Sequence, residues 1–165
     1  MNRFTIDVDF ISFAGMKENF DLLFNVLMVF IQDNEFRLCL DSSNIALAEY
    51  NKIALESEAI RFWFKCLFEI EQSRKYIDYI KIEKQKYSHD KQIYIEICNC
   101  SYSKNKRIIV ANKQSYGELM DILSEKQINL LDGYEAKSML NTRVMQISYG
   151  NNSPNINGNN NIVKK

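Results

Sequence analysis

Apolar residues follow two different spacings along this chain. Apolar residues at every second position, or in short unbroken runs, predict five strands: 3–11, 36–40, 75–82, 107–111 and 127–131. Apolar residues that recur every three or four positions predict helices: 16–33, 45–72 with a break near 55–58, a helix that starts at 88–90, 116–125 and 133–141. Strands that alternate with helices favour an α/β fold, a three-layer sandwich around a largely parallel five-stranded sheet.

The chain divides into a predicted α/β domain, residues 1–141, and a C-terminal segment, residues 142–165. Residues 142–150 resemble one more strand. The Asn-rich tail behind them holds the only proline and too few apolar residues to build a core, so we expect it to be flexible in isolation. We also expect residues 142–165 to bind a second copy of the chain, giving a homo-oligomer, or a cognate partner protein, by adding an extended segment to an open sheet edge.

Composition excludes several classes of protein. The apolar fraction of 46% and the charged fraction of 25% are typical of a soluble globular protein. There is no signal-peptide pattern, and the longest apolar run is too short to span a bilayer, so we expect a cytoplasmic protein without membrane contact. The four cysteines form no CxxC pair and there is one histidine, which argues against a zinc site and for reduced cysteines.

The net charge of zero hides an uneven distribution. Residues 1–73 carry 6 Lys and Arg against 12 Asp and Glu, whereas residues 74–114 carry 10 against 4. This separation fits a metal site beside a phosphate-binding surface, and it fits ordinary solvated charge equally well. The candidates for contacts with an RNA or DNA backbone are Lys81, Lys84, Lys86, Lys91, Lys104, Lys106, Arg107 and Lys113.

Acidic and amide side chains fall near the ends of several predicted strands. Asp7 and Asp9 lie in the second half of the first strand, Glu49 lies one turn into the helix after the second strand, Asp90 opens the helix after the third strand, and Asn112 follows the fourth. Ligands of open parallel sheets bind at the carboxyl ends of the strands, so we expect these groups at one edge. Clustered carboxylates repel one another unless they share a cation, and oxygen ligands suit Mg²⁺ or Mn²⁺.

Each of these residues also has a purely structural explanation. Asp7 and Asp9 would form the polar face of an exposed edge strand, and Glu49 would be a solvated helix charge. Asp90 would be the N-cap of its helix. His89, the only histidine, lies in the same capping context and is interpreted as a cap or surface residue.

Four segments carry a resemblance to a known family: TIDVDFIS (5–12), LCLDSSNIALAEYNK (38–52), HDKQIYIEICNC (89–100) and KRIIVANKQSY (106–116). In their order, over about residues 3–131, they resemble the PIN-like nucleases. The resemblance implies a PIN-like fold with catalytic acids at Asp7, Glu49 and Asp90. The last segment departs from the family pattern, because Asn112 stands where the family has an acid, and an amide brings no charge to a metal.

The favoured hypothesis is therefore a metal-dependent endoribonuclease or related nuclease, whose Mg²⁺ or Mn²⁺ would activate water and stabilise charge on the scissile phosphate. Its ligands would be Asp7, Asp9, Glu49, Asp90 and Asn112. The resemblance also implies a setting, since such domains are commonly toxins of bacterial toxin–antitoxin or anti-phage defence systems. The alternative is a catalytically degenerate PIN-like module that binds RNA or a partner protein. A receiver-like signalling domain is disfavoured, because no lysine follows the strand 127–131.

The nuclease hypothesis makes two structural expectations. The carboxyl groups of Asp7, Glu49 and Asp90 should converge within roughly 4–8 Å, the span that one or two metal ions bridge. Replacing Asp7 by asparagine should not destabilise the fold, because it relieves repulsion between carboxylates.

Overall fold

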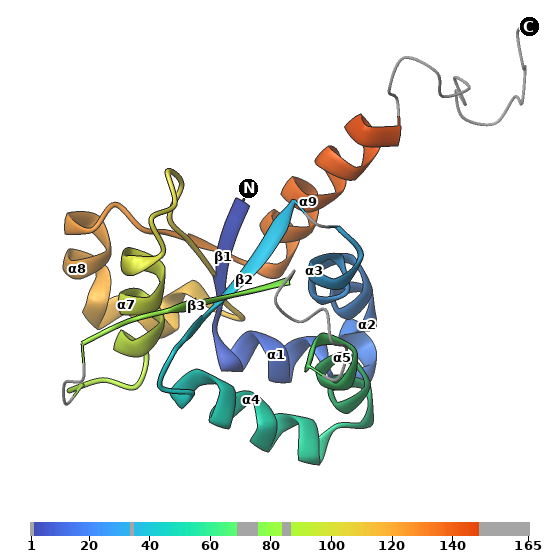
Figure 1. Ribbon diagram of the computed structural model, residues 1–165, viewed down its shortest axis with the longest axis horizontal. Helices are drawn as coiled ribbons and strands as arrows, with labels where there is room; N and C mark the ends of the chain where they lie inside the picture. The colour runs from blue at the N-terminus through green and yellow to red at the C-terminus, as the bar shows by residue number, and fades with distance from the viewer. Residues whose placement is uncertain (1, 34, 69–75, 84–86, 149–165) are drawn as a thin grey trace, which may run out of the picture.

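A single sheet of parallel strands forms the centre of the computed structural model, which describes residues 2–33, 35–68, 76–83 and 87–148, and of residues 141–148 the backbone alone. The strands are β1 (Asn2–Ile6), β2 (Phe36–Asp41), β3 (Ile77–Ile80), β4 (Arg107–Ile109) and β5 (Asn129–Leu131). Their order in the sheet is β3-β2-β1-β4-β5, and every pair is parallel (Figure 1). The predicted α/β fold with a five-stranded parallel sheet is confirmed.

Helices cover both faces of the sheet. They are α1 (Val8–Ala14), η1 (Lys17–Asn19), α2 (Phe20–Leu22), the π-helix η2 (Leu23–Leu27), α3 (Val29–Gln32), α4 (Ile45–Glu56), α5 (Glu58–Phe68), α7 (Gln92–Cys100), the 3₁₀ helix η3 (Lys113–Leu119), α8 (Met120–Glu125) and α9 (Gly133–Ser148). In Figure 1, α7 and α8 lie on one side of the strands, α1, α2, α3, α5 and α9 lie on the other, and α4 runs below the carboxyl end of β1. The layers are those of a three-layer sandwich.

The strand order reverses between β1 and β4. The chain adds β2 and β3 on one side of β1 and then crosses back to place β4 and β5 on the other. Thr5 and Ile6 lie opposite Ile108 and Ile109, so β1 and β4 end at the same level. In open parallel sheets such a reversal leaves a ligand-binding crevice at the carboxyl ends of the two strands.

The prediction of a strand over residues 3–11 is wrong beyond Ile6. Asp7 is the N-cap of α1, and its side chain accepts a hydrogen bond from the backbone N–H of Asp9 at 3.0 Å. Asp9 therefore lies in the first turn of a helix, where negative charge is favoured by the helix dipole. The apolar alternation over Ile6, Val8 and Phe10 imitates a strand, but the Asp cap decides the local structure.

The predictions for the second strand and, as far as Phe68, for the helices after it are confirmed, and the predicted helical residues 69–72 lie outside the described residues. Asp41 ends β2, and its buried carboxylate accepts hydrogen bonds from the backbone N–H groups of Ile45 and Ala46, both at 2.9 Å. These bonds satisfy donors that the first turn of α4 leaves free. The break predicted near 55–58 occurs at Ser57, between α4 and α5.

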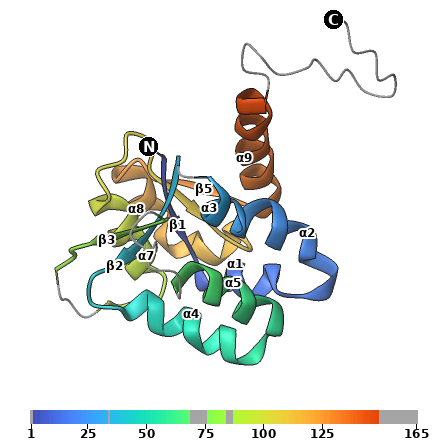
Figure 2. The same cartoon turned by 45° about the vertical axis from the view of Figure 1, so that its right-hand side comes forward.

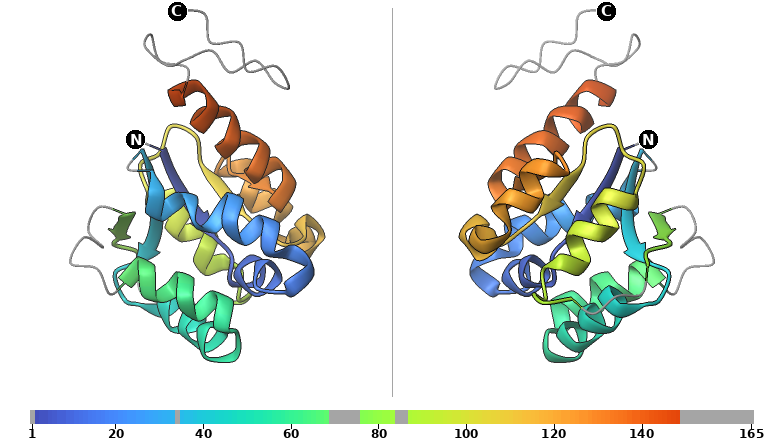
Figure 3. Two further views of the ribbon diagram at one scale, coloured as in Figure 1. Left: turned by 90° about the vertical axis from the view of Figure 1, so that its right-hand side faces the viewer. Right: turned by 90° about the vertical axis from the view of Figure 1, so that its left-hand side faces the viewer.

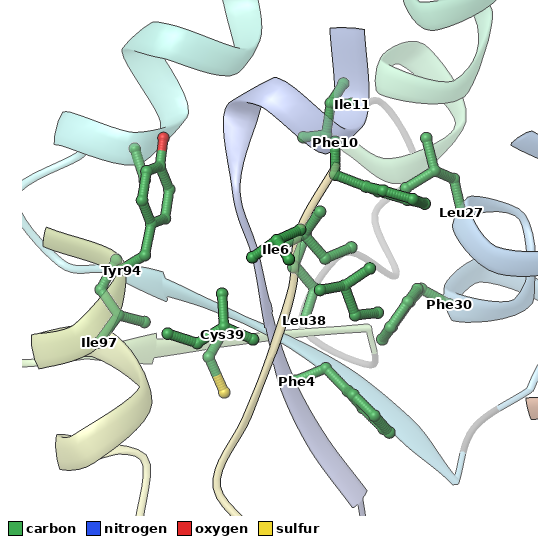
Figure 4. Close-up of a cluster of buried hydrophobic side chains, with 14 of the residues drawn as sticks. Phe4, Ile6, Phe10, Ile11, Leu27, Phe30, Leu38, Cys39, Tyr94 and Ile97 are labelled. Atoms are coloured by element: carbon green, nitrogen blue, oxygen red, sulfur yellow. The ribbon is translucent and has the colours of Figure 1, made fainter. Parts of the chain in front are cut away.

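Adjacent residues of a strand point to opposite faces of the sheet and so pack into two separate core layers. Leu38 of β2 packs in the layer that contains Phe30, whereas Cys39, the next residue, faces Ile97 of α7 (Figure 4). The rings of Phe4 and Phe30 meet edge to face with centroids 5.7 Å apart. All four cysteines are free, as expected for reduced cysteines.

Residues 142–148 are helical and do not form the predicted strand. Asp132 and Glu135 form a reciprocal capping box at the start of α9, and no glycine or proline lies between Gly133 and Gly150. The helix therefore continues to Ser148, and its last turns extend past the other elements (Figures 2 and 3). The Asn-rich tail from residue 149 lies outside the described residues.

No helix within the described ranges is both long and apolar enough to cross a membrane.

Candidate functional site

Asp7 is the centre of the candidate site. It follows β1 at the point where the strand order reverses, and its side chain is buried. Oδ1 accepts the cap hydrogen bond from the backbone of Asp9. Oδ2 accepts from Lys91 Nζ at 2.8 Å and from the hydroxyl of Tyr116 at 2.9 Å. Both carboxylate oxygens are thus engaged by groups of the chain itself.

Lys91 brings a positive charge between two carboxylates. It is the residue directly before α7, and its Nζ forms ion pairs with both Asp7 and Asp9. The Lys91 side chain is only 12% exposed, whereas that of Asp9 is 56% exposed. Burial by itself would lower the pKa of Lys91, but the hydrogen bonds and charges of the two carboxylates outweigh it and raise that pKa. Lys91 is therefore charged at neutral pH.

Tyrosine hydroxyls complete the site. Tyr116 is buried on η3, and Lys91 Nζ also lies 5.7 Å from the centre of its ring. Burial and the adjacent Asp7 charge raise the pKa of Tyr116 well above that of a free phenol, so it stays protonated and donates to the carboxylate. On the other side of Asp7, Tyr50 of α4 donates from its hydroxyl to the carbonyl of Ile6, at the end of β1.

Glu49 lies near the same edge but is held by a different partner. Its carboxylate accepts a hydrogen bond from the hydroxyl of Tyr94 on α7, and Glu49 is half-buried. Burial first, and then the nearby Glu49 and Asp7 charges among other groups, raise the pKa of Tyr94. Tyr94 therefore lies near the charges of both Glu49 and Asp7, and its hydroxyl holds the Glu49 carboxylate at this edge of the sheet.

Asp90 and Asn112 do not have the predicted roles. Asp90 is exposed in the turn before α7, and the Nδ1 atom of His89 accepts the backbone N–H of Lys91 at 3.1 Å, a capping contact that the sequence suggested for Asp90. Asn112 is exposed, and its side-chain oxygen caps η3 by accepting from the backbone N–H of Gln114 at 2.9 Å. The loop after β4 does reach Asp7, but through Tyr116.

These residues do not fit a bound Mg²⁺ or Mn²⁺ ion. Among the described residues, no group of three or more His, Cys, Asp or Glu side chains is arranged to hold a metal. The acids that lie near the sheet edge are hydrogen-bonded within the chain: Asp7 and Asp9 to Lys91, and Glu49 to Tyr94. The place expected for a metal ion contains an ammonium group.

The predicted nucleic-acid-binding residues that the structure describes do not form one surface. Lys106 and Arg107 lie at the amino end of β4, at the opposite edge of the sheet from Asp7, and Lys104 precedes them. Lys106 donates to the side chain of Asn99 at 2.8 Å and to the carbonyl of Lys126 at 3.1 Å. Lys106 therefore stabilises the fold at the end of the sheet opposite Asp7.

The remaining basic candidates are also dispersed. Lys113 is paired with Glu135 at the surface. Lys81 lines a crevice of about 900 Å³ beside the ends of β2 and β3, which it shares with Glu83 and Glu96. Lys84 and Lys86 lie outside the described residues.

Sequence reasoning missed the tyrosines and the function of Lys91. A tyrosine in a helical apolar pattern, such as Tyr94 or Tyr116, is normally interpreted as a core residue, and only the hydroxyl contact separates the two roles. Lys91 was assigned to nucleic acid because it lies in the basic part of the chain. No local pattern distinguishes Lys91 from its neighbour Asp90, because which of the two points toward Asp7 depends on how α7 packs against β1.

Comparison of the chain with protein-family models, curated proteins and solved structures finds no match.

Proposed function

We propose that this chain is a catalytically degenerate PIN-like module that acts by binding a partner protein and not by metal-dependent cleavage. The observation that carries the proposal is that the predicted acids do not form a free set of metal ligands. Asp7 and Asp9 both form ion pairs with Lys91, Glu49 is bound to Tyr94, and Asp90 is exposed on a turn. The four resembling segments and the strand order support a PIN-like module. The pairing of its acids within the chain supports the absence of catalysis.

A protein partner is favoured over RNA by the arrangement of the basic residues. Phosphate backbones are bound by lysines and arginines gathered on one face, with their charges free to displace counterions. Here Lys91 is mostly buried, Lys106 is bonded to Asn99, and Lys113 is paired with Glu135. Among the described residues, the remaining lysines and arginines are dispersed and do not gather on one face for RNA.

We expect the wild-type protein to leave RNA intact. Incubation of the purified full-length chain with single-stranded and hairpin RNAs, in Mg²⁺ or Mn²⁺, should give no cleavage above a buffer control, and EDTA should change nothing. The competing function is a metal-dependent endoribonuclease. Cleavage that EDTA abolishes and that is lost in both Asp7→Asn and Glu49→Gln would establish that function and end the present proposal.

Residues 149–165, the last part of the C-terminal segment, are the proposed carrier of partner binding. We expect a chain that ends after Ser148 to keep its unfolding midpoint, because α9 is complete there and its buried residues Ala136 and Leu140 remain. The same chain should lose self-association or capture of its partner, measured by multi-angle light scattering and by pull-down with the full-length chain as the matched control. Unchanged association would show that residues 149–165 carry no binding.

A further inference from the structure

Two carboxylates share one positive group at the carboxyl end of β1. Lys91 Nζ lies 2.8 Å from Asp7 Oδ2 and also contacts the carboxylate of Asp9. The ammonium therefore lies between two oxygens that are both negatively charged, which is the position a cation takes when two carboxylates bind it together. Two such carboxylates side by side are unfavourable without a positive charge between them.

The location of Lys91 on α7 is unfavourable for a positive charge. It is the N-cap residue of α7, where the partial charge of the helix dipole is positive, and the first turn of α7 has no acidic residue to offset it. The long side chain is also nearly buried, so it loses conformational freedom. Because the helix dipole disfavours the ammonium there and burial removes most of its contact with solvent, the attraction of Asp7 and Asp9 accounts for its position.

We propose that Lys91 is the built-in counterion of the Asp7 and Asp9 carboxylates, and that its ammonium occupies a latent divalent-cation site. This inference rests on the proposed function and extends it, since it identifies the group that lies where a metal ion was expected. The wild-type chain then needs no divalent cation for its fold. Removing the ammonium leaves a pair of carboxylates that a hard cation with oxygen preference can neutralise.

The test is cation rescue of a variant that keeps the shape of the side chain. Lys91→Met retains most of the volume of lysine without its charge. We expect the thermal midpoint of full-length Lys91→Met, followed by circular dichroism, to fall well below that of wild type. It should rise by about 5–10 °C in MnCl₂ at about 100 times the dissociation constant. The same measurement in NaCl at equal ionic strength is the control, because charge screening alone would raise the midpoint of Lys91→Met equally in both salts.

Two further chains complete the design. Wild type should show no such rise in MnCl₂ or MgCl₂, and neither should Lys113→Met, which removes the lysine of the exposed Lys113–Glu135 pair. In the double variant Asp7→Asn, Lys91→Met the Mn²⁺ effect should disappear, because the buried carboxylate is gone. Electron paramagnetic resonance should correspondingly detect manganese binding to Lys91→Met and none to wild type, Lys113→Met or the double variant.

The outcomes separate this inference from the proposed function. If Lys91→Met is folded, its thermal midpoint does not respond to Mn²⁺ or Mg²⁺, and wild type does not cleave RNA, the latent cation site is wrong. The proposed binding module is unaffected by that result. A Lys91→Met chain that does not fold even in Mn²⁺ also overturns it, because the cation has then failed to replace the ammonium. Binding of Mn²⁺ by wild type that depends on Asp7 overturns both.

Discussion

Replacing Asp7 by asparagine is expected to lower the free energy of unfolding by about 3 kcal/mol, because it leaves a nearly buried ammonium with one of its two carboxylates removed. Asparagine still accepts the cap hydrogen bond from the backbone of Asp9, so the loss comes from Oδ2, which carries the charge facing Lys91 and accepts the hydrogen bond of the Tyr116 hydroxyl. Urea denaturation followed by circular dichroism should show a midpoint lower by about 1 M or more. The sequence alone favours the opposite result, since it shows the carboxylates but not the lysine between them.

The control for this prediction makes the same chemical change at the surface. Asp21 is paired with Lys137 at 2.6 Å, but its side chain is 54% exposed. Asp21→Asn should therefore change the free energy of unfolding by less than about 1 kcal/mol. If Asp7→Asn is as stable as Asp21→Asn, Lys91 does not depend on Asp7 and the buried ion pair is energetically unimportant.

Truncating Trp63 to alanine is expected to be the most damaging change in the core, at about 3–5 kcal/mol. Trp63 is fully buried on α5, its ring lies 6.3 Å from that of Tyr50 on α4, and its Nε1–H donates to the carbonyl of Leu27 on η2 at 3.0 Å. One side chain thus joins three elements. A loss of this size is a large part of the total stability of a typical domain.

Trp63→Phe separates the two contributions of this side chain. Phenylalanine keeps an aromatic ring but removes the hydrogen bond to Leu27, so we expect a smaller loss than for alanine. Trp63 is the only tryptophan, and its replacement removes the main intrinsic fluorescence signal, so circular dichroism should follow unfolding. Equal losses in the two variants would assign the stabilisation to the hydrogen bond alone.

Elements whose signals are local could be predicted from the sequence. The strand that ends at Asp41 and the break at Ser57 each depend on residues within a few positions of one another. The end of β1 and the extension of α9 were mispredicted. At the first place apolar alternation was given more weight than the helix cap at Asp7, and at the second residues 142–150 were interpreted as a separate strand although no glycine or proline ends the helix over those positions before Gly150.

The candidate site was predicted in part. The sequence placed Asp7 and Glu49 at the carboxyl edge of the sheet, and both lie near Tyr94 there. It could not show which of the adjacent residues Asp90 and Lys91 turns inward, because this depends on where the first turn of α7 begins relative to β1. It also could not show that Tyr116 would reach Asp7 from η3.

By itself, the sequence determined the alternation of strands and helices, the apolar positions that build the core, and the carboxylates near the strand ends, because these follow from periodicity and order along the chain. Only the tertiary structure decided what those carboxylates contact. Lys91 is separated from Asp7 by 84 positions, and the two meet because the chain crosses from β3 back to β4 and lays α7 against β1. The sign of the charge beside Asp7, and with it the choice between a metal ion and an ammonium group, is therefore a property of packing between distant segments.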